Sequence, residues 1–255
     1  MMTQRRYYPL VTLALVFALN LFTGSLSSQA KDLLLGVEDI DYYPIYAQRE
    51  AGYAGFSREF FDAFARKYQH AITYKALPVK RLYSEFINGR LDLKFPDNTR
   101  WASDKKSGHD IVYSKGILNY IDGVMVLPEN LGRGEARLQK IGTVRGFTPW
   151  IYLPNLQAGT IELQENSSLK GLVDLVRAKR IEGAYCNILV ARYYLKHTLL
   201  EQNVIVFDNA LPHSRSAYHV SSIKHPAIIA QINQFLLDEA RFVEALKKKY
   251  EIDLL

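Results

Sequence analysis

From residue 31 onward, short apolar runs alternate with segments in which apolar residues recur every three or four positions. The short runs predict buried strands at 33–37, 72–76 and 91–95, and the segments between them predict helices at 56–68 and 79–88. The first helix carries an aromatic stripe that we interpret as core packing, not as a cofactor site. Because a helix separates each strand from the next, we expect parallel pairing with right-handed crossovers, and hence an α/β fold.

A long apolar run at 121–128 predicts a strand that leaves one lobe and enters a second α/β unit. In that unit we expect strands at 141–144, 160–163 and 183–187, a helix at 169–178 capped by Ser167 and Ser168, and a helix that carries Tyr193. The chain then returns through 211–219, and helices at 225–237 and 240–250 cover the first lobe.

Two crossings between the units predict two lobes and a hinged cleft. The expected parts are lobe 1 at 31–122 and 214–255, lobe 2 at 126–208, and hinges at 123–125 and 209–213. Polar loops at the carboxyl ends of strands meet in a crevice outside an α/β sheet, so the cleft is the expected binding site.

The first 30 residues have the pattern of a secretory signal. Arg5 and Arg6 form a basic start, an apolar core runs from 10 to 22, and Ser28 and Ala30 supply the small residues of a cleavage site. A retained membrane anchor is the alternative, but the core is short and Asn20 interrupts it. With no cysteine near the cut for lipid attachment, we expect a soluble mature protein that starts near Lys31, in the periplasm of a bacterium.

Composition argues against several functional classes. Without the signal, 30 basic residues face 26 acidic ones, and this net charge of +4 is spread along the chain, so a nucleic-acid partner is not expected. The single cysteine, Cys186, excludes an intramolecular disulfide; it could be a catalytic thiol, but its apolar neighbours favour a buried, inert one. The six histidines show no metal-ligand spacing, and no phosphate-binding loop or nucleophile elbow is present, so neither metal nor cofactor is expected.

The stretch at 88–101 carries the first candidate site. After the strand at 91–95, Pro96 lacks an N–H and is expected to end the pairing, and polar and aromatic groups follow it. These candidate ligand-binding residues are Asp97, Asn98, Arg100 and Trp101. The alternative is a surface turn made of Pro, Asp and Asn, with Trp101 covering the lobe.

Other candidates lie beside the expected cleft. Arg145, Phe147 and Thr148 are expected to open a helix whose free amides would bind an anion, unless they form a plain cap. Tyr43 could stack on a ligand or pack in the core. Arg81, at the start of a helix, could face the cleft or the solvent.

Several pieces of the mature chain, in this order and spacing, resemble one family. They are GYAGF at 52–56, FINGRLD at 86–92, YS at 113–114, DGVMV at 122–126, IGTVRG at 141–146 and RIEGAYCN at 180–187. Together they resemble the periplasmic solute-binding proteins of the amino-acid-binding group (family 3, type II fold). The resemblance implies two α/β lobes that close on one small polar molecule and deliver it to an inner-membrane transporter.

The chain departs from this family at two positions. The family's arginine for the α-carboxylate would correspond to Arg100, in a longer loop. The family's acidic residue for the α-ammonium falls on Asn187, whose amide offers no charge, and Asp97 could take over that role. We therefore expect Asp97 and Asn98 to face Arg145, Thr148 and Asn187 across the cleft.

Three functional classes follow. The first is a monomeric binding protein that delivers an anionic or zwitterionic, amino-acid-like solute to an ABC-type transporter. The second is a ligand-sensing partner of a membrane receptor. The third is a dehydratase-like enzyme on the same scaffold, in which Asp97, Glu85 or His109 would act as acid or base.

Overall fold

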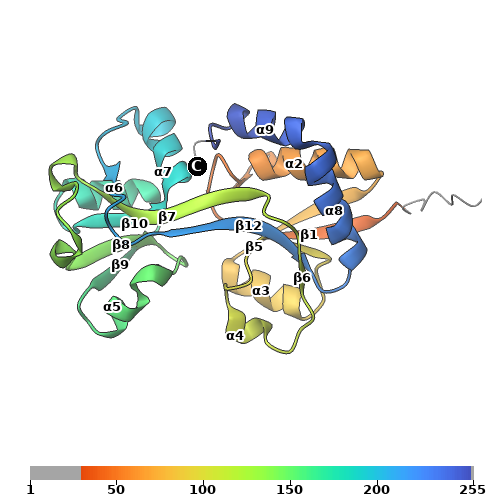
Figure 1. Ribbon diagram of the computed structural model, residues 1–255, viewed down its shortest axis with the longest axis horizontal. Helices are drawn as coiled ribbons and strands as arrows, with labels where there is room; N and C mark the ends of the chain where they lie inside the picture. The colour runs from red at the N-terminus through yellow and green to blue at the C-terminus, as the bar shows by residue number, and fades with distance from the viewer. Residues whose placement is uncertain (1–29, 254–255) are drawn as a thin grey trace, which may run out of the picture.

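The computed structural model describes residues 30–253 and shows two α/β lobes joined by a pair of long strands (Figure 1). The proposed signal, except for its last residue, lies outside the described residues. Among residues 30–253, no helix is long and apolar enough to cross a membrane.

Lobe 1 contains a mixed sheet in the order β4-β1-β5-β12, with β6 beside β12. The strands are β1 (Asp32–Glu38), β4 (Ala71–Leu77), β5 (Leu93–Asp97), β6 (Val112–Tyr113) and β12 (Ser214–Ser222), with a separate hairpin of β2 (Ala47–Arg49) and β3 (Gly52–Ala54). Strand β1 pairs in parallel with both β4 and β5, which confirms the predicted parallel pairing.

Helices cover both faces of this sheet (Figure 1). On one face lie α2 (Phe56–Tyr68), α8 (Pro226–Asp238) and α9 (Ala240–Lys249), and on the other α3 (Val79–Ile87) and α4 (Ser103–Lys106). The aromatic stripe of α2 packs in the core, as predicted: Phe60, Phe61 and Phe64 are fully buried, and the ring centroids of Phe61 and Phe95 lie 5.2 Å apart.

Lobe 2 holds the order β7-β10-β8-β9, with β11 beside β7. Its strands are β7 (Leu118–Val126), β8 (Lys140–Val144), β9 (Glu162–Asn166), β10 (Gly183–Asn187) and β11 (Val206–Phe207). Its helices are α5 (Leu153–Gln157), α6 (Leu169–Arg177) and α7 (Ile188–Tyr194), with short turns η1 (Pro128–Asn130), η2 (Glu135–Arg137), η3 (Trp150–Tyr152) and the π-helical η4 (Leu195–Leu199). The Ser168 hydroxyl accepts a hydrogen bond from the Gly171 amide, so the predicted N-cap of α6 is confirmed.

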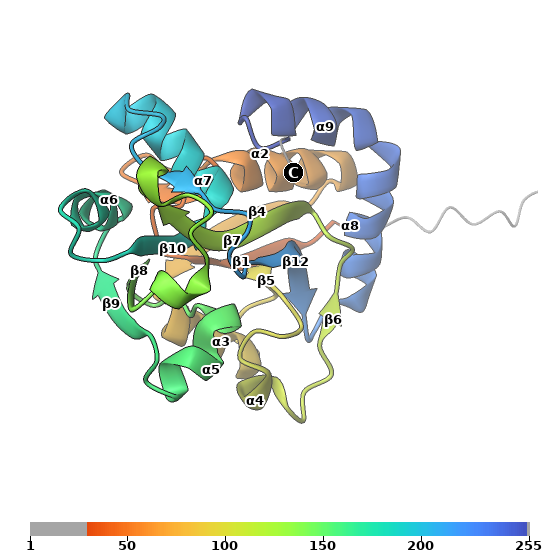
Figure 2. The same ribbon diagram turned by 60° about the vertical axis from the view of Figure 1, so that its left-hand side comes forward.

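Strands β7 and β12 connect the lobes and lie side by side in both ribbon views (Figures 1 and 2). They pair antiparallel from Leu118 with Tyr218 to Asp122 with Ser214. Beyond this segment, β12 pairs with β5 in lobe 1, whereas β7 pairs with β10 in lobe 2. Two continuous strands thus hold the facing edges of the lobes together.

Two local predictions were wrong. Pro96 does not end the third strand, because β5 continues to Asp97 and the pairing register of β12 shifts between His219 and Ser221. This irregularity accommodates a residue that has no N–H to donate. Nor do residues 145–148 open a helix, because regular turns begin only at Trp150.

Candidate functional site

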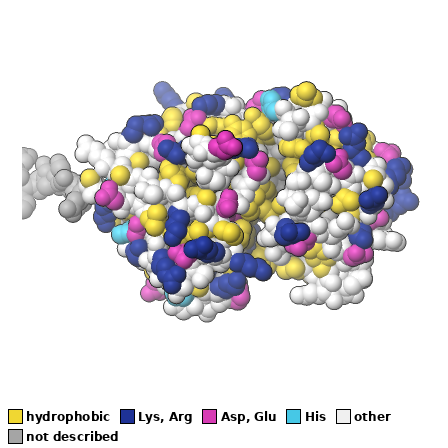
Figure 3. Space-filling model, turned by 180° about the vertical axis from the view of Figure 1, so that it is seen from behind, with side chains coloured by type: hydrophobic (Ala, Val, Ile, Leu, Met, Phe, Trp, Pro, Cys, Tyr) yellow, Lys and Arg dark blue, Asp and Glu magenta, His cyan; other side chains and the backbone are white. Residues whose placement is uncertain are grey.

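A cavity of about 300 Å³ lies between the lobes, at the carboxyl ends of the parallel strands. Lobe 1 contributes the end of β1, the following loop, the start of α3 and the segment around α4; lobe 2 contributes 146–150 and the end of β10. Asp122 of β7 and Tyr218 of β12 line it from the connecting strands. Figure 3 shows hydrophobic side chains gathered along the seam between the two halves.

Aromatic side chains from both lobes form much of the cavity lining. Tyr42 of lobe 1 stacks on Phe147 of lobe 2, with ring centroids 4.8 Å apart and planes 16° apart. Trp101 lies edge-on to Tyr218, at 5.9 Å between centroids. These contacts give the cavity apolar surfaces that favour a flat or aliphatic group.

Glu38, the last residue of β1, brings a buried carboxylate to the cavity. The Tyr46 hydroxyl donates a hydrogen bond to its Oε2 at 2.6 Å. Burial raises the pKa of Glu38, and the nearby Lys94 ammonium and the Tyr46 hydrogen bond only partly oppose this. A strand that is buried on both faces carries this side chain directly into the site.

Asp122 is the second carboxylate of the cavity. Its Oδ1 is shielded from solvent and has no hydrogen-bond partner within residues 30–253. Burial raises the pKa of Asp122 to about 7, although a hydrogen bond from Asn187 lowers it. A solvent-shielded acceptor without a donor is costly, so this oxygen marks the place where a ligand group would be stabilised.

Asn187 lines the cavity as predicted, but its polar groups already serve the fold. Its Oδ1 accepts from the amides of Leu189 at 3.0 Å and Val190 at 3.1 Å, and so caps α7. Its Nδ2 donates to the Tyr218 hydroxyl at 3.0 Å. The predicted amide for a ligand is therefore also the N-cap of a helix.

We expect Asn187→Ala to lower the free energy of unfolding by about 1–3 kcal/mol, since it removes a helix cap and leaves the Tyr218 hydroxyl without its donor. Ser168→Ala is the matched control, because it removes only a cap and should cost about 0.5–1 kcal/mol. Urea unfolding of both variants measures the difference. Equal losses would show that the bond to Tyr218 contributes nothing.

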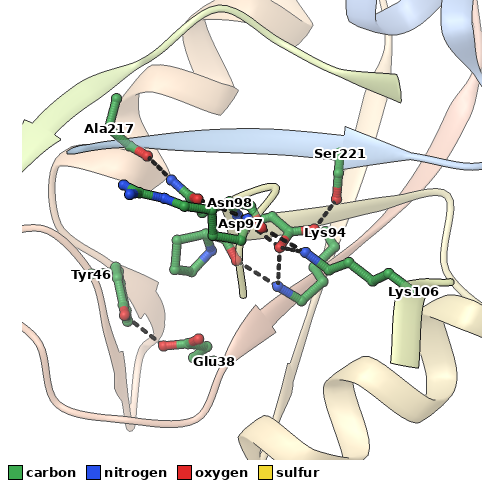
Figure 4. A network of polar contacts seen from close by, with 10 residues as sticks. Glu38, Tyr46, Lys94, Asp97, Asn98, Lys106, Ala217 and Ser221 are labelled. Atoms are coloured by element: carbon green, nitrogen blue, oxygen red, sulfur yellow. Dashed lines mark hydrogen bonds and ion pairs between the residues drawn. The ribbon is translucent and has the colours of Figure 1, made fainter. Parts of the chain in front are cut away.

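Asp97 and Asn98 do not reach the cavity; both are buried in a polar network of lobe 1 (Figure 4). The Asp97 Oδ1 accepts from Lys106 Nζ at 2.7 Å and lies 3.3 Å from Lys94 Nζ, while its Oδ2 accepts from the Ser221 hydroxyl at 2.6 Å. The Asn98 amide donates to the Ala217 carbonyl at 3.1 Å. The expectation that these two side chains face the cleft is wrong, because buried lysines hold the carboxylate inside the lobe.

The other sequence candidates fall into two groups. Those that line the cavity are Trp101, Phe147, Thr148 and Asn187, and those that do not are Tyr43, Arg81, Arg100 and Arg145. The three arginines are exposed to solvent. Tyr43 lies against Tyr193 and Tyr250 beside a second cavity of about 450 Å³.

The predicted anion site at 145–148 is not formed. The Arg145 amide donates to the Asn166 carbonyl at 2.8 Å, and the Phe147 amide to that of Val144 at 3.0 Å. The Gly146 amide lies 3.4 Å from a Glu165 carboxylate oxygen. These amides donate to groups of the protein itself and are not free to bind an anion, because the segment is a tight loop and not a helix start.

Sequence reasoning missed Glu38, Tyr42, Tyr83, Asp122 and Tyr218 as cavity residues. Two signals were available: Glu38 directly follows a buried strand, and Asp122 is a charged residue within an apolar one. Across the part of the chain that the structure describes, no group of three His, Cys, Asp or Glu side chains could hold a metal ion.

The fold is similar to solved amino-acid-binding proteins. The GluR0 ligand-binding core in complex with L-glutamate matches at TM-score 0.68 and 14% identity, covering 87% of this chain and 98% of that one. An arginine transport system periplasmic binding protein from Legionella pneumophila matches at 0.65 and 14%, covering 87% and 100%. The ancestral amino acid-binding protein AncCDT-1, a precursor of cyclohexadienyl dehydratase, matches at 0.64 and 16%, covering 86% and 95%.

No family model matches the sequence. No curated protein matches it either. The structural similarity, at these identities, shows the fold: two α/β lobes of the type II periplasmic binding arrangement, as the sequence predicted.

Proposed function

We propose that this protein binds one small organic solute in the cavity between its lobes, in the periplasm, and presents it to a membrane partner. The solvent-shielded, unpartnered Oδ1 of Asp122, set among aromatic walls from both lobes, is the observation that carries the proposal. Solved proteins with this fold include an amino-acid transporter's substrate-binding protein and an arginine-binding protein of a transport system. The export signal expected at residues 1–30 supports the location.

We propose delivery to an ABC-type transporter as the primary role, with a sensory receptor as the alternative partner. The three residues considered as catalytic acids or bases, Asp97, Glu85 and His109, do not line the cavity. Asp97 is held by buried lysines, and Glu85 pairs with Lys75 and Arg90. Their positions favour binding over catalysis.

We further propose that the lobes rotate about the central part of the connecting strands. Residues 123–126 of β7 pair with β10 and belong to the sheet of lobe 2. Residues 119–121 pair only with β12, which passes to β5 beyond His219. This pairing supports a hinge at 119–121 and 215–217, a few residues toward lobe 1 from the boundaries expected at 123–125 and 209–213.

The two tryptophans of the chain provide a direct test. Trp101 belongs to lobe 1 and Trp150 to lobe 2, and both line the cavity, so a bound solute changes the environment of both indoles. We expect a saturable change in intrinsic fluorescence on titration with a deproteinised cell extract. Trp150→Phe should keep the part of the change that Trp101 reports. Fluorescence that stays constant in both proteins would contradict binding at this cavity.

A further inference from the structure

We propose that the solute is a small organic cation with N–H donors and an apolar body, such as a protonated amine, and that it lacks the carboxylate of an amino acid. The inference rests on the proposed function and names the ligand class of the same cavity. It changes the expectation from the sequence, which was an anionic or zwitterionic solute.

The first argument is the charge of the carboxyl groups at the cavity. Glu38 is buried and accepts a hydrogen bond from the Tyr46 hydroxyl. Asp122 is half-buried, and its solvent-shielded Oδ1 has no hydrogen-bond partner among residues 30–253. Burial and the Asp122 and Glu38 carboxyl groups raise the pKa of Tyr218, which lines the same cavity. An N–H donor with a positive charge would supply the missing partner of Asp122 Oδ1 and offset the cost of two buried acids.

The second argument is the position of the positive charges. Among the lining residues in the described chain, only Lys80 and Lys105 are cationic, and both are exposed to solvent. The buried cations nearby, Lys94 and Lys106, lie within 2.7–3.3 Å of Asp97 oxygen atoms and do not line the cavity. A ligand carboxylate would thus meet no buried cation at the cavity, and a carboxylate taken out of water without a cationic partner is costly.

The third argument is the aromatic surface. Tyr42, Trp101 and Phe147 line the cavity. Tyr83 also lines it, but the Lys94 ammonium already lies 4.1 Å from the centroid of its ring. The face of an aromatic ring attracts a cation within about 6 Å and also packs against an apolar skeleton. The pocket therefore provides both a negative end and an apolar wall for a single amine.

Protonation gives the site a pH dependence. The groups that face Asp122 are Tyr42, Tyr120, Tyr185, Cys186, Asn187 and Tyr218, all neutral at pH 7. With its pKa raised to about 7, Asp122 must lose a proton to pair with a cation. Affinity for an amine should therefore rise with pH by up to about tenfold per unit below pH 7, and level off above it.

The experiment uses matched probes in calorimetric titrations at pH 8. One set is 2-phenylethylamine, phenylalanine and 3-phenylpropanoate, which share a phenylalkyl body and differ in charge. A second pair without a ring is pentylamine and hexanoate. We expect at least one of the two amines to bind at least tenfold more tightly than the acid of its set. In the first set, 2-phenylethylamine should also bind at least tenfold more tightly than phenylalanine.

Asp122→Asn keeps the shape of the side chain but removes the charge, so it should weaken amine binding at least tenfold. Asp110→Asn is the matched control, since Asp110 is an exposed carboxylate of lobe 1 that does not line the cavity; the affinity of this variant for the amine should change less than threefold. An effect of equal size in both variants would overturn the role of Asp122.

Two failures are distinguishable. Tighter binding of phenylalanine or of an acid, or no binding of any amine while a compound from cell extract does bind, would overturn the cationic ligand and leave the binding function standing. No fluorescence change with the probes or with the extract would overturn the binding function itself.

Discussion

Replacing Asp97 by alanine should lower the free energy of unfolding by about 3–5 kcal/mol, because two buried ammonium groups would lose their counter-ion. Lys94 is fully buried and Lys106 nearly so, and both lie beside Asp97 Oδ1, at 3.3 and 2.7 Å. Burial already lowers the pKa of Lys106, and only Asp97 opposes that effect. Urea denaturation at pH 7 measures the loss.

Asp104→Ala is the control, because this exposed carboxylate lies nearby on α4 and should change stability by no more than about 0.5 kcal/mol. The sequence alone suggested the reverse for Asp97: a ligand contact whose loss spares the fold. A stable Asp97→Ala variant with weakened ligand binding would restore that interpretation and contradict the buried network.

Replacing Asp122 by asparagine should raise the free energy of unfolding of the ligand-free protein at pH 8, by about 2–4 kcal/mol. The folded state raises the pKa of Asp122 from 3.8 to about 7, so folding disfavours the ionised form. Between these two values the folded protein binds more protons than the unfolded one, and stability due to Asp122 falls as pH rises. Above about pH 7 the cost is complete and constant.

The difference between Asp122→Asn and the wild type should therefore be large at pH 8 and small near pH 4. Carboxylates whose pKa is lowered, such as those of Asp92 and Glu251, lose stabilisation at acidic pH, but they do so equally in both proteins. Thermal unfolding of both proteins from pH 4 to 8 isolates the contribution of Asp122. Equal stability at pH 8 would show that the carboxylate has a partner or is hydrated.

If Asp122→Asn both raises the free energy of unfolding and weakens amine binding, the Asp122 carboxylate is a charge that destabilises the fold but binds the ligand. Stability and function then oppose each other at one residue.

Most of the fold could be predicted because local patterns and burial agree. Apolar runs separated by helical segments predicted the parallel pairing of β1 with β4 and β5, and Ser168 predicted the start of α6. The error at Pro96 arose because a proline in a central strand is tolerated only beside an irregularity of the neighbouring strand, and β12 is more than a hundred residues away in sequence.

The site was harder to predict, because burial of polar groups depends on tertiary structure. The alternation in 91–95 suggests that Lys94 points to solvent, but β5 is a central strand with helices over both faces, so that face is buried too. Because Lys94 and Lys106 are buried in lobe 1, their counter-ion Asp97 is buried with them. The carboxyl groups at the cavity that are not exposed to solvent are those of Glu38 and Asp122, which no short motif distinguishes.

Native mass spectrometry tests the central claim most directly. The mature protein, exposed to deproteinised cell extract and then freed of unbound compounds, should carry one small molecule per chain. The same treatment of a Glu38→Gln, Asp122→Asn double variant should leave it empty, because the two carboxylates that reach the interior of the cavity are neutralised. A wild-type protein that carries no compound, or a double variant that retains the same one, would contradict the account.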